Sequence, residues 1–148
     1  MCGILGIYNL DGKIVNKQNL KLMGDQLSHR GPDGEGIYAN NTIGFFHKRL
    51  AILDTSEKGK QPMHSKDGKW VIVFNGCIYN FKELREELIA SGYKFSSNSD
   101  TEVIVEGLSA YGVDFFKRFN GMFAIGAWNT EEKKLYLSRD RYGIKPLY

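Results

Sequence analysis

The chain has 148 residues, of which 42% are hydrophobic and 13% aromatic, which is enough for one domain with a substantial apolar core. Its 20 basic and 17 acidic residues are interspersed, so the net charge of +3 forms no basic stripe and indicates no nucleic-acid partner. Two cysteines are too few for a disulfide-stapled secreted domain, and neither a membrane span nor a signal peptide is recognisable. We therefore expect a cytoplasmic protein with no membrane partner. The three histidines lack metal-ligand spacing, so no metal site is expected.

The first half of the chain predicts a strand, a helix and a hairpin. Residues 2–8 form a short apolar run typical of a buried strand, and residues 16–30 carry Leu20, Met23 and Leu27 at helical spacing. After a glycine-rich break, strands at 36–41 and 42–53 are expected to pair across two adjacent asparagines.

The middle of the chain predicts a loop, a strand and two helices. Residues 55–69 are polar, and residues 70–76 form a β-branched and aromatic run typical of a buried strand. Helices are expected at 80–92 and 99–112, each opened by a capping box and closed by a glycine. The expected capping pairs are Asn80 with Glu83 and Ser99 with Glu102. The expected apolar faces are Phe81, Leu84, Leu88 and Ile89 in the first helix, and Ile104, Leu108 and Tyr111 in the second.

The last part of the chain predicts a helical turn near Phe115 and a hairpin of strands at 121–129 and 133–140. Hairpins therefore outnumber strand–helix–strand units. This order of elements favours an α+β fold with largely antiparallel sheet.

The N-terminus raises the first chemical question, because Cys2 directly follows the initiator methionine. If Met1 is removed, Cys2 carries a thiol and a free α-amine a few ångströms apart. The thiolate is the reactive form, and an α-amine with an ordinary pKa of about 7.7–8.0 is suited to take the proton. From these residues alone, Cys2 is either an N-terminal nucleophile or a small apolar residue at the start of a strand.

Further polar residues stand where predicted elements break or end: Arg30 in the glycine-rich break, Arg49 before an apolar run, Asn75-Gly76 at a strand end and Asp100 at a helix start. Each has an ordinary explanation when taken singly. A surface arginine, a turn and a helix cap would account for them.

Taken together, these residues lie in a set of motifs with a known counterpart. The chain resembles the glutaminase domain of the class II glutamine amidotransferases, which are N-terminal-nucleophile hydrolases, and within them it is most similar to the glutamine-hydrolysing asparagine synthetases. The motifs that carry the resemblance are MCGI-x-G, HRGPDG, RLAILD, QPM, FNG-x-IYN, SDTEVI, NGMFAIGAW and SRDRYGIKPLY. They span the whole chain in the family's order.

The resemblance implies a fold and a set of roles. The fold is a four-layer α-β-β-α sandwich of two antiparallel sheets. Cys2 would attack the side-chain amide of glutamine, and Asn75 and Gly76 would form the oxyanion hole. Arg49 would hold the substrate carboxylate, Asp100 would hold its ammonium group, and the Arg30 loop would support Cys2. The implied substrate-binding set is Arg49, Leu50, Ala51, Ile52, Leu53, Asn75, Gly76, Cys77 and Asp100.

One residue in this set departs from the family pattern. The asparagine synthetase motif has a glutamate where this chain has Cys77, and that acid would help to bind the substrate ammonium. Cys77 could therefore weaken glutamine binding, or it could face the core as a small apolar residue.

The resemblance also implies a longer protein. The family's glutaminase domain continues through more strands into an ATP-dependent synthetase domain, and neither is within residues 1–148. We expect a C-terminally incomplete glutaminase domain that itself needs no cofactor, with ATP and Mg²⁺ serving the synthetase domain.

The expected activity is hydrolysis of glutamine to glutamate and ammonia, with the ammonia supplied to an asparagine-forming synthetase. The expected partners are glutamine, the synthetase domain and a second copy in a homodimer. Two alternatives remain open: the glutaminase domain of another class II amidotransferase, and a degenerate domain that binds glutamine without turning it over.

Overall fold

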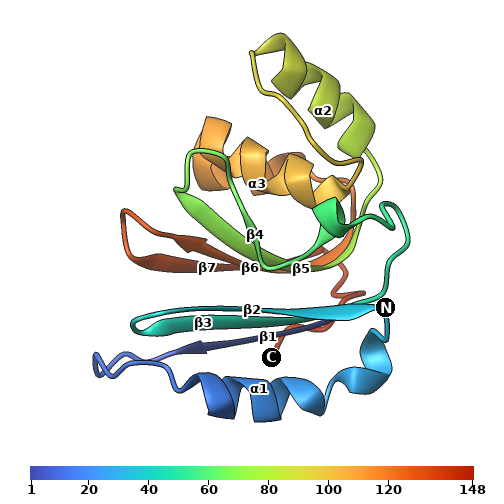
Figure 1. Ribbon diagram of the computed structural model, residues 1–148. Coiled ribbons are helices and arrows are strands. Elements are labelled where there is room, and N and C mark those ends of the chain that lie inside the picture. The colour runs from blue at the N-terminus through green and yellow to red at the C-terminus, as the bar shows by residue number, and fades with distance from the viewer.

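The computed structural model describes all 148 residues and arranges them in four layers, helix, sheet, sheet and helices (Figure 1). Both sheets are antiparallel, with the strand orders β1-β3-β2 and β4-β5-β6-β7. The strands are β1 (Gly3–Tyr8), β2 (Gly34–Asn40), β3 (Ile43–Arg49), β4 (Met63–His64), β5 (Trp70–Ile78), β6 (Gly121–Asn129) and β7 (Lys134–Arg139). This confirms the predicted α+β class and both predicted hairpins.

The helices form the two outer layers (Figure 1). The helix α1 (Lys17–Asp25) covers the three-stranded sheet, α3 (Asp100–Tyr111) packs on the four-stranded sheet, and α2 (Phe81–Ala90) packs on α3. Three short 3-10 segments join them: η1 (Ser28–Arg30), η2 (Glu57–Gly59) and η3 (Gly112–Arg118). No helix in the chain has both the length and the apolar character that crossing a membrane requires.

The central strand β5 is buried on both faces, which explains its unbroken apolar sequence. Trp70, Ile72 and Phe74 belong to the main core beneath α2 and α3, whereas Val71 and Val73 face the other sheet. The alternate residues of β3 behave in the same way, because Phe45 packs between the sheets and Phe46 packs against α1. The period of two in each strand therefore identifies which side chains enter the layer between the sheets.

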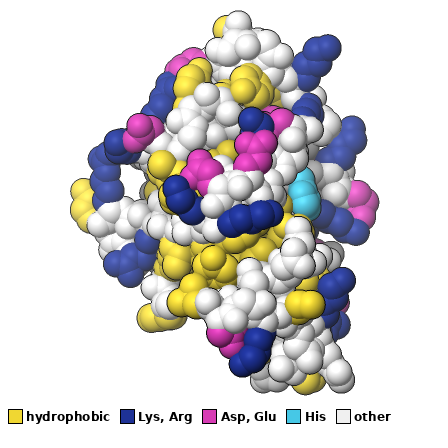
Figure 2. Space-filling view, turned by 90° about the vertical axis from the view of Figure 1, so that its left-hand side faces the viewer, with side chains coloured by type: hydrophobic (Ala, Val, Ile, Leu, Met, Phe, Trp, Pro, Cys, Tyr) yellow, Lys and Arg dark blue, Asp and Glu magenta, His cyan; other side chains and the backbone are white.

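That layer has two different ends. Figure 2 shows the end that carries the β2–β3 and β6–β7 turns, where hydrophobic side chains form a band between the two sheets. The opposite end lies at the N-terminus, beside the last residues of β3 and β5 (Figure 1).

Several local expectations are wrong. Asn80 makes no side-chain cap for α2, because its amide donates to the Arg118 carbonyl (3.0 Å) and its oxygen accepts from the Asn120 N–H (2.9 Å). These bonds join the start of α2 to the segment before β6. The capping box of α3 is half correct: the Ser99 hydroxyl accepts from the Glu102 N–H at 3.2 Å, but the Glu102 carboxylate binds other residues.

The element bounds and exposed faces also differ in part. The first helix stops at Asp25, and β3 stops at Arg49, so that residues 50–53 are irregular. The expected loop at 55–69 contains η2 and the two-residue strand β4. Ile89 is 52% exposed and Tyr111 is 44% exposed, so neither belongs to the buried face of its helix.

Candidate functional site

The candidate site lies at the N-terminal end of the layer between the sheets. In β3 the inward-facing residues change from apolar to polar at His47 and Arg49, and in β5 they change at Asn75 and Cys77. Ile4 packs into the same layer, so Cys2, two residues earlier and immediately before β1, lies on this face. Three strands thus present their polar ends to one region.

A cavity of about 280 Å³ occupies this region, and its wall includes every residue that the sequence singled out for catalysis or substrate binding. These residues are Cys2, Arg49, Leu50, Ala51, Ile52, Leu53, Asn75, Gly76, Cys77 and Asp100. They come from four separate parts of the chain. Their convergence brings a thiol, a guanidinium, an amide and a carboxyl group to one cavity.

Cys2 is held against the segment that follows β3. Its Sγ accepts from the Leu50 N–H at 3.3 Å and donates to the Leu50 carbonyl at 3.6 Å. The Arg30 guanidinium donates to the Cys2 carbonyl at 3.5 Å. Asp33, from the same glycine-rich break, accepts from the Ala51 N–H at 2.9 Å. The break therefore holds both Cys2 and the cavity wall in place.

Arg49 is 7% exposed, and its guanidinium is fixed by the loop that follows it. Its Nη1 donates to the Ser56 carbonyl at 2.8 Å, and its Nη2 donates to the Asp54 carbonyl. A guanidinium has five N–H donors, so others are left for a ligand. These carbonyl contacts orient a buried positive charge on the cavity wall.

Asn75 and Gly76 lie where β5 passes the cavity. The side-chain amide of Asn75 makes no hydrogen bond within the protein, although the residue is buried. At Gly76, a Cβ atom would lie 2.1 Å from the Met122 carbonyl oxygen, so only glycine permits β6 to approach this closely.

Asp100 is the first residue of α3 and is 4% exposed. Its carboxylate accepts from the Ile78 N–H at 3.0 Å, which joins the helix start to the end of β5. Burial raises the pKa of Asp100 to about 6, although its backbone hydrogen bonds oppose the shift. A ligand with a positive charge would favour the ionised form.

Cys77 lies on the cavity wall rather than in the apolar core. Burial, and then the negative charge of Asp100, raise the pKa of the Cys77 thiol, and Lys145 acts in the opposite direction. The core-facing alternative for Cys77 is therefore wrong.

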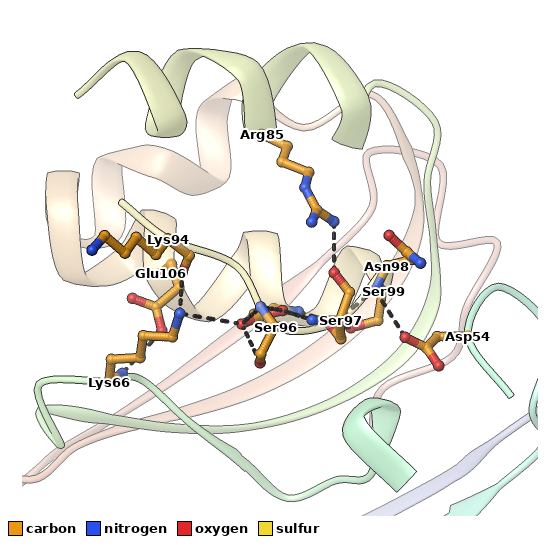
Figure 3. Close-up of polar contacts among 10 residues, drawn as sticks. Asp54, Lys66, Arg85, Lys94, Ser96, Ser97, Asn98, Ser99 and Glu106 are labelled. Carbon is orange, nitrogen blue, oxygen red and sulfur yellow. Dashed lines mark hydrogen bonds and ion pairs between the residues drawn. The ribbon is translucent and has the colours of Figure 1, made fainter. Parts of the chain in front are cut away.

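The segment before Asp100 is held by a polar network (Figure 3). The Glu102 carboxylate accepts from the Ser96 N–H and the Ser97 N–H at 2.9 and 2.7 Å. The Asn98 N–H donates to Asp54 at 2.8 Å, and Arg85 donates to the Ser97 carbonyl at 2.7 Å. The network connects α2, α3 and the loop that binds Arg49, so it fixes Asp100 relative to Arg49.

Among the cavity residues that the sequence analysis missed are His47, Gln61 and Lys145. Both ring nitrogens of His47 are buried without a hydrogen-bond partner, and burial, followed by the charge of Arg49, lowers its pKa to about 4. The even spacing of His47 and Arg49 along one strand was a usable signal for the histidine. Gln61 and Lys145 lie in the QPM and SRDRYGIKPLY motifs, which supported the resemblance but were assigned no role.

Comparisons with known proteins point to one family. A family model described as a glutamine amidotransferase domain matches residues 1–148. Asparagine synthetase (glutamine-hydrolyzing) 1 of Bacillus subtilis (strain 168) is 42% identical over 151 residues, and asparagine synthetase (glutamine-hydrolyzing) 2 of the same strain is also 42% identical. All of this chain is matched, but it spans only 24% and 20% of the length of these relatives.

A solved structure shows the same fold. The glutamine phosphoribosylpyrophosphate amidotransferase from B. subtilis, complexed with ADP and GMP, matches with a TM-score of 0.78 and 22% identity. The match covers 98% of this chain and 38% of that chain. The likeness confirms the predicted sandwich of two antiparallel sheets between helices.

Proposed function

Because the chain belongs to the glutamine amidotransferase family, we propose that it hydrolyses glutamine to glutamate and ammonia, with Cys2 as the nucleophile. One observation carries the proposal. A single cavity brings the Cys2 thiol together with a buried cation, a buried carboxyl group and a side-chain amide that makes no hydrogen bond within the protein.

The two charged groups fit the two charged ends of an amino acid. The remaining N–H groups of the Arg49 guanidinium would donate to the substrate α-carboxylate, and Asp100 would bind the α-ammonium. The backbone from Leu50 to Leu53 would line the space between them. Binding at both ends would leave the side-chain amide of glutamine to reach Cys2.

The chemistry begins with proton transfer within one residue. After removal of Met1, the α-amine of Cys2 takes the thiol proton, and the sulfur attacks the substrate carbonyl carbon. The same proton is then delivered to the departing ammonia. A γ-glutamyl thioester remains on Cys2, and water hydrolyses it to glutamate and the free thiol.

Negative charge develops on the substrate oxygen during the attack. The Asn75 side-chain amide and the Gly76 N–H are the donors proposed to stabilise it. Loss of one such donor typically lowers the rate about 10²–10³-fold. The absence of protein hydrogen bonds to the Asn75 amide leaves that donor available.

The ammonia would be used by a further domain. We propose that the chain is the glutaminase part of an asparagine-forming enzyme, joined to a C-terminal synthetase domain in a cytoplasmic protein that forms a homodimer. ATP and Mg²⁺ would bind the synthetase domain, since nucleophilic hydrolysis by Cys2 involves neither. The support is the likeness to the two B. subtilis asparagine synthetases over the full chain.

The test is glutamate release from glutamine by the complete protein, after mass spectrometry has shown that Met1 is gone. Cys2→Ala should abolish release while the melting temperature stays near that of the unmutated protein. A verified Met1-bearing preparation should also be inactive, because an amide nitrogen cannot act as the base. Turnover by either sample would contradict the mechanism.

Cys77 favours one alternative outcome, a domain that binds glutamine without hydrolysing it. Calorimetry with glutamine on the same Met1-free sample separates the two. Binding without glutamate release would support the degenerate domain.

A further inference from the structure

Lys145 is a buried cation in the segment that follows β7 (Figure 1), and only 4% of it is exposed. Its backbone N–H donates to the Asp140 carboxylate at 3.0 Å. The same carboxylate accepts from the N–H groups of Phe123, Tyr142 and Ile144 at 2.9 to 3.2 Å. Asp140 thus anchors the segment to β6 and directs the Lys145 side chain to the cavity.

The Lys145 ammonium has no acidic partner within the distance of a salt bridge. Its hydrogen-bond contact is the Met1 sulfur, and its charge also acts on the nearby Cys77 thiol. A buried charge without a counter-ion is costly, so its retention calls for a reason beyond packing. The contact with Met1 directs that charge toward the N-terminus.

We propose that Lys145 is a positioning residue that acts through the α-amine of Cys2, holding this amine in its neutral form after Met1 has been removed. The inference rests on the proposed function, because it assigns a reason for the amine to be an effective base. Lys145 would not touch the substrate or exchange protons with it.

The physical basis is repulsion between like charges. An α-amine with an ordinary pKa of about 7.7–8.0 is mostly protonated at neutral pH and then cannot accept the thiol proton. A neighbouring cation disfavours protonation and lowers the pKa of the amine. Protonation of the amine would place two positive charges at one end of the cavity.

The size of the effect follows from the distance. The contact between Lys145 and the Met1 sulfur places the ammonium within about 8 Å of the nitrogen of Cys2. At an effective dielectric constant of about 20, a unit charge at this distance shifts a titration by about one to one and a half pH units. Such a shift would leave at least about half of the amine neutral at pH 7.

Other ionisable groups surround this end of the cavity and contribute to the same field. They are Arg30 of η1, His47 and Arg49 of β3, Asp54, Cys77 of β5 and Asp100 of α3. Asp54 interacts with Ser56 and Asn98, and burial raises the pKa of Asp100 to about 6. Asp100 and the Cys2 amine would both change protonation over the pH range in which the rate of hydrolysis changes. A pH–rate profile alone would therefore combine the effects of these two groups.

The decisive measurement therefore observes the amine directly. Labelling with ¹⁵N-cysteine introduces a signal at the Cys2 amine of the complete, Met1-free protein, which is identified by its absence from Cys2→Ala. The Cys2 shift is followed from about pH 5 to about pH 10, without glutamine, in Lys145→Met, Lys145→Arg and the exposed control Lys82→Met. This titration is independent of turnover, so it remains informative if the proposed glutaminase activity is absent.

The midpoint for the Cys2 amine should rise by about one pH unit in Lys145→Met and stay at the wild-type value in Lys145→Arg and Lys82→Met. The acid limb of kcat/KM for glutamine should shift in the same direction. If Lys145→Met does not fold, Lys145→Gln takes its place in the comparison. An unmoved midpoint in the neutral variant would overturn the proposal, as would loss of turnover in Lys145→Arg with an unmoved amine titration.

Discussion

Replacement of Gln61 by methionine is expected to weaken both sides of the substrate cavity at once. Gln61 is 7% exposed and lies between the strand that carries Asn75 and the helix that begins at Asp100. Its Oε1 accepts from the Phe74 N–H at 2.6 Å, and its Nε2 donates to the Thr101 hydroxyl at 3.2 Å. Phe74 and Thr101 are the immediate neighbours of Asn75 and Asp100, two residues of the proposed site.

The magnitude follows from these two bonds. Methionine has nearly the same length and fills the space, but it leaves the buried Phe74 N–H without an acceptor, which costs about 1–3 kcal/mol. Loss of the bond to Thr101 adds about 1 kcal/mol. A total of about 2–4 kcal/mol corresponds to a fall in melting temperature of roughly 5–15 °C for a domain of this size.

The assay is thermal melting together with the KM for glutamine. KM should rise, because Asp100, the proposed ammonium ligand, loses the support that Gln61 gives through Thr101. Gln18→Met is the matched control, since Gln18 is exposed on α1 and its side chain makes no hydrogen bond. Thr101→Val removes only the weaker bond and should show about a third of the effect. A change in melting temperature no larger than that of the control would refute the argument.

Three further variants test the charged groups of the cavity. Cys77→Glu should lower the KM for glutamine roughly tenfold, as measured by steady-state kinetics. A well-formed charge-assisted hydrogen bond contributes about 1.5–3 kcal/mol, and repulsion from Asp100 keeps the gain near the lower end of this range. An unchanged or higher KM would contradict this prediction. Arg49→Lys should raise KM by more than tenfold and change kcat less, since a point charge cannot replace a bidentate fork; an unaltered KM would show that Arg49 does not hold the substrate. Asp100→Asn should weaken glutamine binding yet raise the melting temperature at pH 7. The pKa of Asp100 in the folded state, about 6, lies above its ordinary value of 3.8. Asp100 therefore stabilises the wild-type fold below pH 4, and this contribution to the free energy of unfolding, on the order of 3 kcal/mol, is lost as pH rises to 6. His47, with its pKa lowered to about 4, acts in the opposite direction and loses stability as pH falls from about 6.5. Melting curves between about pH 4 and pH 7 should therefore show a steeper acid loss in Asp100→Asn than in the wild type, and parallel curves would contradict this assignment.

The sequence by itself determined the elements whose patterns are local. Alternation and apolar runs located the strands of both hairpins and β5, and helical spacing located α1, α2 and α3. Ser99 was identified as a cap because a cap bonds to backbone only a few residues away. The set of residues around the cavity came from motif resemblance, since residues this far apart in the chain carry no periodic signal.

Only the tertiary structure decided which hydrogen-bond partners a polar residue has and which face of a strand it occupies. Asn80 carries the chemistry of a helix cap, yet the chain near Arg118 and Asn120 competes for the same side chain and satisfies both of its ends. Cys77 could have faced either side of β5, and the packing of the second sheet placed it on the cavity wall.

Gln61 and Lys145 show the same limit most clearly. One lies in an irregular loop and the other follows the last strand, so neither has a periodic neighbour to reveal its direction. Their partners are Phe74, Thr101 and Met1, which lie far away in the sequence. A hydrogen bond or a charge acts over a few ångströms of space, whatever the separation along the chain, so these roles exist only once the two sheets have packed together.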